Sequence, residues 1–294
     1  MTVRSLMKSA EQRIRGKEVF TVIDANGEIR EDVKVITPLM QEAAKKRKEL
    51  ETYRSRTDNP FTLVSMEASK EVALLEELNT KELGYFLILQ SYVDYSNMLK
   101  KSSDANIPMT ERELGEALKI KNRKHYIKVI DKFISLGLIY KESVTHYNKE
   151  YQAFFIDKKY CIRGSNRSDK VVKMFIGSVQ ELYNQEEIKP ADIGFLFKIL
   201  PYMHFQSNHL VRHPYERDFA KAEPLSQANI IEITGLDKKN VQKHMRMKLS
   251  GVSVFGTFRT GRNSVYKVNP GLFFRGVKPD EILLADFKLT GQSL

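Results

Sequence analysis

The sequence predicts a mainly α protein with small β-hairpin wings, built as two tandem winged helix-turn-helix domains packed as a pseudo-symmetric pair. The chain of 294 residues is long enough for two domains that each bury a core. Its composition, 41% hydrophobic and 29% charged, is that of a globular protein. Two further observations support this fold: an internal repeat, and the order helix, turn, helix, hairpin in each half of the repeat.

The repeat has an offset of about 110 to 116 residues. Three segments recur in the same order: an apolar helical run, a proline-led helix start, and a closing run that ends in Arg-Gly. Chance similarity between two α-rich domains is the alternative. The matching segments are 83–92, 108–110 and 156–164 in the first half, and 193–202, 224–226 and 268–276 in the second.

The repeat predicts the domain organisation. The long apolar runs at 82–99 and 191–206 are expected to form the central helix of each unit, and they could pack against each other. The predicted divisions are an N-terminal extension with a basic helix (1–59), winged-helix domain 1 (60–164), winged-helix domain 2 (165–276) and a C-terminal tail (277–294).

The second unit shows the helix-turn-helix signals most clearly. Ser226 is a good N-cap for a first helix, and Gly235 permits a left-handed C-cap. Asp237 begins a second helix that is expected to end at Ser250–Gly251. Two β-like runs, 252–259 and 264–268, then flank a Gly/Asn turn and predict a hairpin.

The first unit follows the same order. Thr110 and Glu113 form a capping-box pattern at the start of one helix. A break at 120–122 precedes a second helix with Tyr126 on its inward face, and Gly137 ends that helix. Two further runs, 138–141 and 152–156, flank a polar loop that would be the wing.

The net charge of +11 favours a polyanionic partner such as DNA, RNA or an acidic membrane surface. The sequence contains no run of about 18 apolar residues, so no transmembrane helix and no membrane partner are expected. The N-terminus lacks the apolar core of a signal peptide, and a single cysteine cannot form an internal disulfide. We therefore expect a protein of the bacterial cytoplasm or nucleoid.

The second helix of each unit carries cations opposite its apolar face. Aligning Tyr126 with Val241 places Lys124 over Lys239, and also Lys128 over Lys243. Such a helix fits the major groove, where Lys and Arg meet phosphates or guanine, and Asn and Gln pair with adenine. A solvated helix face is the alternative, but recurrence at the same register disfavours it. The predicted DNA-binding residues on these helices are Lys121, Arg123, Lys124, Lys128, Lys238, Lys239, Asn240, Gln242, Lys243 and Arg246.

Two other basic segments have two interpretations each. Arg259, Arg262 and Asn263 lie at or near the tip of the second wing, where cations commonly contact phosphates or the minor groove. A hairpin that is polar for solubility is equally consistent with these residues. The segment 43–56 predicts a basic helix, either an arm that lies on DNA or a solvated helix.

No pattern in the sequence predicts a catalytic site, a metal site or a cofactor. A glycine-rich phosphate loop is missing. His209 and His213 could share a helix face but lack a third ligand nearby. Cys161 lies in an apolar stretch, which favours a packed residue over a nucleophile. We therefore do not expect an enzyme.

The segment Tyr266–Gly276, which follows the second hairpin, reads Tyr-Lys-Val-Asn-Pro-Gly-Leu-Phe-Phe-Arg-Gly. It resembles the closing segment of firmicute plasmid replication proteins of the RepL type. The resemblance covers about 189–276; the first unit has Asp157–Lys158 in place of the Asn-Pro step. It implies binding at a replication origin and recruitment of host replication proteins rather than DNA cleavage. Similar phage and plasmid chains are also described as regulators of the multiple-antibiotic-resistance type.

These observations favour a sequence-specific double-stranded DNA-binding protein of a phage or plasmid, acting as a replication initiator or a transcription regulator. Two DNA-binding domains in one chain suit a DNA site that is a direct or an inverted repeat. The alternatives are a non-specific nucleic-acid-binding protein and a protein-interaction module for an acidic partner. Host replication or transcription proteins are further candidate partners, and the sequence leaves the oligomeric state open.

Overall fold

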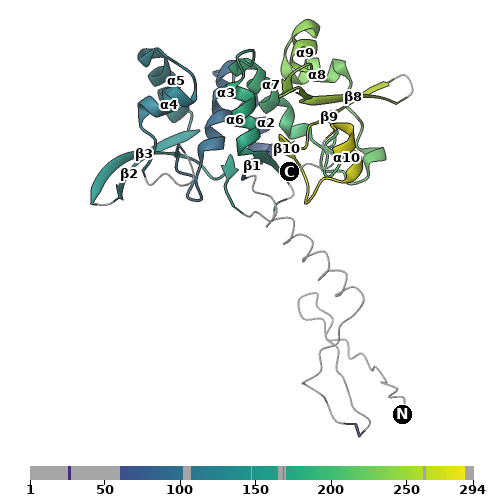
Figure 1. Ribbon diagram of the computed structural model, residues 1–294, viewed down its shortest axis with the longest axis horizontal. Helices are drawn as coiled ribbons and strands as arrows, with labels where there is room; N and C mark the ends of the chain where they lie inside the picture. Colours follow the sequence, from purple (N-terminus) through teal and green to yellow (C-terminus); the bar gives the residue numbers. More distant parts are fainter. Residues whose placement is uncertain are drawn as a thin grey trace. The chain divides into compact units, whose positions relative to one another are not determined.

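A computed structural model of the chain describes residues 26–27, 60–101, 107–146, 148–164, 168, 170–260 and 263–288. The chain divides into two compact units, Met1–Arg56 and Thr57–Leu294, and all helices and strands described below belong to the second (Figure 1). The basic helix predicted at 43–56 lies outside the described residues.

The prediction of a mainly α fold made of two tandem winged-helix domains is wrong. The described residues contain 9 α-helices and 10 strands, with 40% helix and 24% strand, which makes the protein a mixture of α and β structure. The structure contains a four-stranded antiparallel sheet with the order β10–β5–β1–β4, which the sequence does not predict. Each half supplies only two of its strands, so neither half alone shows the pattern of a sheet. The strands are β1 (Phe61–Ser65), β4 (Cys161–Ile162), β5 (Val171–Phe175) and β10 (Phe273–Phe274).

The two central strands of this sheet, β1 and β5, pair antiparallel with their midpoints opposite each other. Phe61 of β1 lies opposite Phe175 of β5, and Ser65 lies opposite Val171. Leu63 and Lys173 form the central pair. The outer strands continue the same arrangement, because β4 pairs with β1 as β10 pairs with β5.

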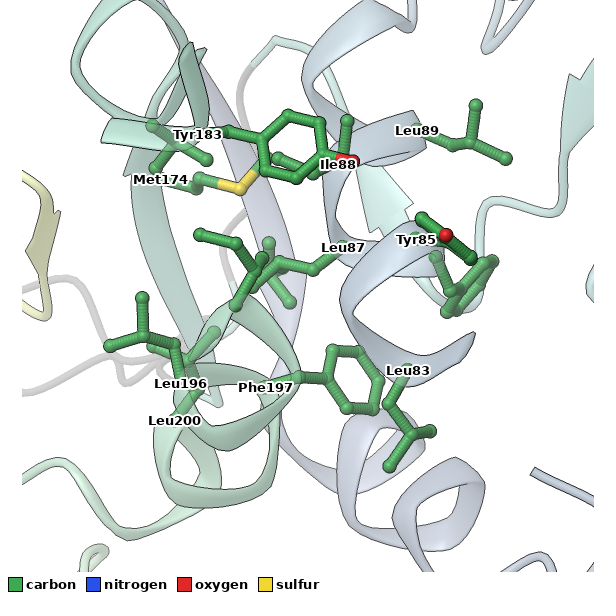
Figure 2. Close-up of a cluster of buried hydrophobic side chains, with 14 of the residues drawn as sticks. Leu83, Tyr85, Leu87, Ile88, Leu89, Met174, Tyr183, Leu196, Phe197 and Leu200 are labelled. Carbon is green, nitrogen blue, oxygen red and sulfur yellow. The ribbon is translucent and has the colours of Figure 1, made fainter. Parts of the chain in front are cut away.

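Two helices, α3 (Thr80–Leu89) and α7 (Pro190–Ile199), pack against each other in the core (Figure 1). Figure 2 shows side chains of both helices, among them Leu87 and Phe197, filling the space between them with Tyr183 and Met174 at one end. Both helices end sooner than the sequence predicts. Each passes into a short 3-10 turn, after which the chain folds back in an antiparallel bridge, Val93 with Leu99 and Met203 with Leu210. The flanking elements are α2 (Met66–Ala73), α6 (Ile176–Asn184), η1 (Gln90–Tyr92) and η2 (Leu200–Tyr202).

The close approach of α3 and α7 depends on one glycine in each helix. A Cβ atom added to Gly84 would lie 1.8 Å from the carbonyl oxygen of Pro190, and one added to Gly194 would lie 1.7 Å from that of Thr80. These distances are far below van der Waals contact, and the opposing atoms belong to the backbone. The backbones can therefore meet only because both positions lack a side chain.

Two helix–helix–hairpin segments flank this pair, one on each side in Figure 1. The predicted caps are confirmed: Thr110 and Ser226 each accept from the backbone N–H three residues on and complete a capping box, and Gly235 is left-handed with φ 66°. The first segment consists of α4 (Glu111–Ala117), α5 (Arg123–Ser135), β2 (Ile139–His146) and β3 (Lys149–Ile156). The second consists of α8 (Gln227–Thr234), α9 (Lys238–His244), β6 (Lys248–Leu249), β7 (Val252–Ser253), β8 (Phe255–Thr260) and β9 (Asn263–Val268).

Helix α9 is shorter than predicted. It ends at His244, and the predicted continuation to Ser250–Gly251 is instead a small hairpin, β6–β7. Ser250 and Gly251 have φ values of 48° and 86°, as expected for a two-residue hairpin turn of the primed type. The serine-glycine step therefore turns a strand rather than ending a helix.

The predicted C-terminal tail is part of the packed unit up to Lys288. It contains helix α10 (Glu281–Asp286). The short 3-10 turn η3 (Phe219–Lys221) lies earlier in the chain, between η2 and α8. Leu283 and Phe287 are buried against Phe175 and Phe274 in a small cluster of their own. These contacts attach the tail to one face of the central sheet.

Candidate nucleic-acid interface

The outward face of α5 is cationic over its first half. Asn122 caps the helix by accepting from the N–H of His125 at 3.2 Å. The cations Lys121, Arg123, Lys124 and Lys128 are all exposed. Among the described residues, none of the four forms an ion pair with a carboxylate. Their charges are therefore available to a ligand.

The same face of α5 is not uniformly basic. Arg123, Lys124 and Lys128 line a shallow hollow with Ile127 and Asp131. Asp131 is exposed one turn beyond Ile127. Its carboxylate would repel a phosphate, so the cationic character of α5 is concentrated at its N-terminal end.

Helix α9 presents a similar face. Asp237 caps it by accepting from the N–H of Asn240 at 2.9 Å, and the amide of Asn240 donates back to Asp237 at 2.6 Å. Lys238, Lys239 and Lys243 are exposed and form no ion pair within the described part of the chain. Two other predicted residues of this group differ in setting. Gln242 is half-buried, and Arg246 is exposed in the turn just after the helix rather than on it.

The two helices share one register over their N-terminal turns. Tyr126 donates its N–H to the carbonyl of the cap Asn122 at 3.1 Å, and Val241 donates to Asp237 at 3.0 Å. Both side chains are buried. Counting from these shared positions, Lys124 corresponds to Lys239 and Lys128 to Lys243. The structure thus reproduces the register that the sequence alignment predicts.

A buried polar contact anchors α9 to the core. The Nδ1 atom of His244 lies 2.7 Å from Oδ1 of Asp192, while Oδ2 of Asp192 accepts from the N–H of Lys189 at the start of α7. The His244 ring also stacks on Phe195, with 4.8 Å between ring centroids. Burial by itself raises the pKa of Asp192, but the hydrogen bonds from His244 and Lys189 outweigh it and hold this pKa below its ordinary value.

An analogous contact anchors α5. Lys132 donates to Oε1 of Glu82 at 2.8 Å and to the carbonyl of Glu77 at 2.6 Å. Glu82 completes the capping box of α3 by accepting from the N–H of Asn79 at 3.0 Å. Both anchors therefore use the acidic residue in the first turn of a central helix. These anchoring contacts were not predicted, although the acidic residue at this place in both repeats is a signal for them in the sequence.

The second wing is only partly described. Arg259 is exposed on β8 and pairs across the hairpin with Ser264. Arg262 lies outside the described residues, and for Asn263 the backbone in β9 is described but not the side chain. The first wing has mixed charge, because Glu142 follows Lys141 on β2. Lys141 also forms an ion pair with Glu111 of α4 at 3.0 Å.

The other polar groups singled out in the sequence lie in the interior or apart from each other. Cys161 is buried in β4, and burial raises the pKa of its thiol, which suits a packed residue. His209 and His213 do not share a helix; they lie in the irregular segment between η2 and η3. Burial lowers the pKa of His209 to about 3, with a smaller contribution from the charge of Lys267, so its ring is neutral. No group of three or more His, Cys, Asp or Glu residues that could hold a metal ion occurs in the described ranges.

Within the same ranges, no helix is both long enough and apolar enough to cross a bilayer. Comparison of the chain with protein-family models, with curated proteins and with solved structures finds no match. The interpretation of the basic surface therefore depends on its own geometry.

Proposed function

We propose that this protein binds double-stranded DNA in a sequence-specific manner, with the N-terminal parts of α5 and α9 placed in the major groove. The observation that carries the proposal is the recurrence of exposed cations at equivalent positions on two helices. Lys124 and Lys128 on α5 match Lys239 and Lys243 on α9, and none of them forms an ion pair with a carboxylate among the described residues. A face that served only solubility would have no reason to keep its register in both halves.

The chemistry of these side chains suits DNA. Lysines that neutralise phosphates release condensed counterions, which supplies a large part of the affinity for a duplex. The planar guanidinium of Arg246, the amide of Gln242 and the guanidinium of Arg123 can donate to base edges and so provide sequence preference. Asn240 can do so only if it exchanges its hydrogen bond to Asp237, at 2.6 Å, for one to a base.

The proposed role is that of a phage or plasmid replication initiator or a transcription regulator. Both roles need the same surface, so the location of the bound site distinguishes them. An iterated array in an AT-rich origin indicates initiation, whereas a single site over a promoter indicates regulation. The expected footprint has two half-sites with centres one helical turn, about 34 Å, or a multiple of it apart.

The test is selection of bound fragments from random and genomic duplexes by the purified full-length protein at about 150 mM salt, where screening is near physiological. We expect a single enriched motif. If no motif is enriched but unrelated duplexes bind with equal affinity and a steep loss with salt, binding is non-specific and the proposal fails in its sequence-specific form. If no duplex binds at all, the basic helices serve another acidic partner and the proposal is wrong.

A further inference from the structure

We infer that the DNA site of this chain is an imperfect inverted repeat rather than a direct repeat, so that a single chain reads its two halves on opposite strands. The inference rests on the proposed function and adds the arrangement and the inequality of the half-sites. It follows from the way in which the two helix–helix–hairpin segments are joined.

The central sheet is related to itself by a two-fold rotation. In the β1–β5 pair, Leu63 faces Lys173, and residues on either side pair reciprocally, as Phe61 does with Phe175 and Ser65 with Val171. Two copies related by translation would place equivalent strands parallel. The antiparallel pairing of β1 with β5, which is centred on one residue pair, instead requires a two-fold axis that passes between Leu63 and Lys173.

The same two-fold axis relates helix α3 to helix α7. Gly84 of α3 meets Pro190 of α7, and Gly194 of α7 meets Thr80 of α3, at Cβ distances of 1.8 Å and 1.7 Å to the carbonyl oxygens. This is a reciprocal contact of the kind that defines a two-fold interface between identical subunits, although here it lies within one chain. Sheet and helix pair therefore share one pseudo-symmetric frame.

Each helix–helix–hairpin segment is fixed to that frame by the same device, a buried asparagine. Asn97 donates through its amide to the carbonyls of Ile156 and Cys161 at 3.0 and 2.7 Å. Asn208 donates to the equivalent carbonyls, those of Val268 and Phe273, at 3.1 and 2.7 Å. Both asparagines are fully buried and have positive φ, 69° and 53°.

The extended stretch that leads into each segment is held by a corresponding backbone hydrogen bond. Met109 donates its N–H to Leu99, and Leu225 donates to Leu210, both at 2.9 Å. Because the frame, the asparagine attachment and the helix caps all correspond, the two-fold axis also relates α5 to α9. In Figure 1 these helices lie on either side of the α3–α7 pair, at the same edge.

Duplex DNA has its own two-fold axes perpendicular to the helix axis, and a protein with two-fold related heads aligns its axis with one of them. Each helix–helix–hairpin segment then contacts its half-site in the same 5′-to-3′ direction, but on opposite strands, so the two half-sites form an inverted repeat. A direct repeat needs heads related by a translation along the duplex, and the reciprocal contacts of β1 with β5 and of α3 with α7 rule out that relation within this unit.

The inverted repeat in the DNA is expected to be imperfect because the two helix–helix–hairpin segments differ where they are expected to contact bases. Counting from the shared caps, Ile127 of α5 corresponds to Gln242. Farther along, α5 carries Asp131 within the helix, whereas α9 has ended and Arg246 lies in the turn that follows it. A carboxylate accepts from the amino group of cytosine, whereas a guanidinium donates to guanine. The two half-sites must therefore differ in sequence, although they share an inverted orientation.

The experiment begins with the motif recovered by selection and compares three duplexes of equal length and composition. In the first the motif is intact, in the second one half is replaced by its reverse complement to create a direct repeat, and in the third that half is scrambled. We expect the second duplex to bind the full-length protein as weakly as the third, at least about tenfold below the intact motif, which corresponds to about 1.4 kcal/mol. Equal binding of the first and second duplexes, or recovery of a direct repeat in the selection, overturns the inference and leaves the proposed function standing. Failure to enrich any motif overturns the proposed function, and this inference falls with it.

Directed cleavage tests the orientation of the heads. The equivalent positions Arg123 and Lys238 each receive a cysteine (R123C and K238C) that carries an iron chelate, and Cys161 will not compete for the label because it is 1% exposed. We expect the two labelled proteins to cut at positions that are symmetric about the centre of the motif and lie on opposite strands. Cuts related by a simple shift along one strand would contradict the two-fold relation. The unlabelled protein, taken through the same treatment, is the control.

Discussion

The crossing of α3 and α7 makes a sharp prediction about Gly84. Replacement by alanine places a Cβ atom 1.8 Å from the carbonyl oxygen of Pro190 and 2.9 Å from the backbone nitrogen of Gly194. Ordinary contact begins near 3.4 Å. No side chain can rotate away, because the opposing atoms belong to the backbone, so the two helices must separate by roughly 1.5 Å.

The free-energy cost of separating the two helices exceeds the gain from the intrinsic helix preference of alanine. Alanine in place of glycine favours a helix by about 1 kcal/mol. Overpacking a rigid core costs about 3 kcal/mol or more when backbone has to move, since every neighbouring pair loses part of its dispersion attraction. We therefore expect Gly84→Ala to lower the free energy of unfolding by about 2 kcal/mol or more.

Urea unfolding followed by circular dichroism measures this effect. Gly177→Ala is the matched control, because Gly177 is exposed near the start of α6 and should be neutral or slightly stabilised. The double variant with Gly194→Ala should lose less than the sum of the single losses, because the first separation relieves the second contact. A Gly84→Ala protein as stable as the wild type would refute the close crossing.

Three further predictions concern the buried polar groups. Asn208→Ala should lower the free energy of unfolding by about 2 to 3 kcal/mol, since the buried carbonyls of Val268 and Phe273 lose their donors; a change below 0.5 kcal/mol in urea unfolding would speak against the attachment. The folded-state pKa of Asp192 lies below its unfolded value near 3.8, so its stabilising effect is present above that value and is lost as the pH falls through the folded pKa. Asp192→Asn should therefore be less stable at neutral pH and lose less stability between about pH 4 and pH 2 than the wild type, and parallel pH profiles would count against the contact with His244. Cys161 should react with a thiol reagent only at the rate of unfolding, and rapid labelling of the native protein would show that β4 is not packed as described.

The sequence predicted the local elements better than their assembly. Helix caps such as Thr110 and Ser226 depend on neighbouring residues, and the structure confirms them. The equivalence of Lys124 with Lys239 was also visible, because it depends only on counting from the caps. The length of α9 was wrong because Ser250–Gly251 is as compatible with a hairpin turn as with the end of a helix.

The central sheet could not be found in this way. Strands β4 and β10 are two residues long, and β1 pairs with β5 from the other half of the chain. A pattern of alternating residues within one segment does not reveal a partner more than a hundred residues away. The same limit applied to the anchors of the basic helices, since the contact of Asp192 with His244 and that of Glu82 with Lys132 join residues far apart in sequence.

The most direct measurement for the central claim is the affinity of charge-reversal variants for the selected duplex, followed by fluorescence anisotropy at several salt concentrations. Three double variants remove the same charge: K124E/K128E on α5, K239E/K243E on α9, and K101E/K158E, whose exposed lysines lie outside both helices. We expect each of the first two variants to weaken binding about 100-fold at about 150 mM salt and to reduce the salt slope by about two units, whereas the affinity of the third stays close to that of the wild type. If all three variants bind the duplex alike, the basic faces of α5 and α9 do not form the DNA-binding surface.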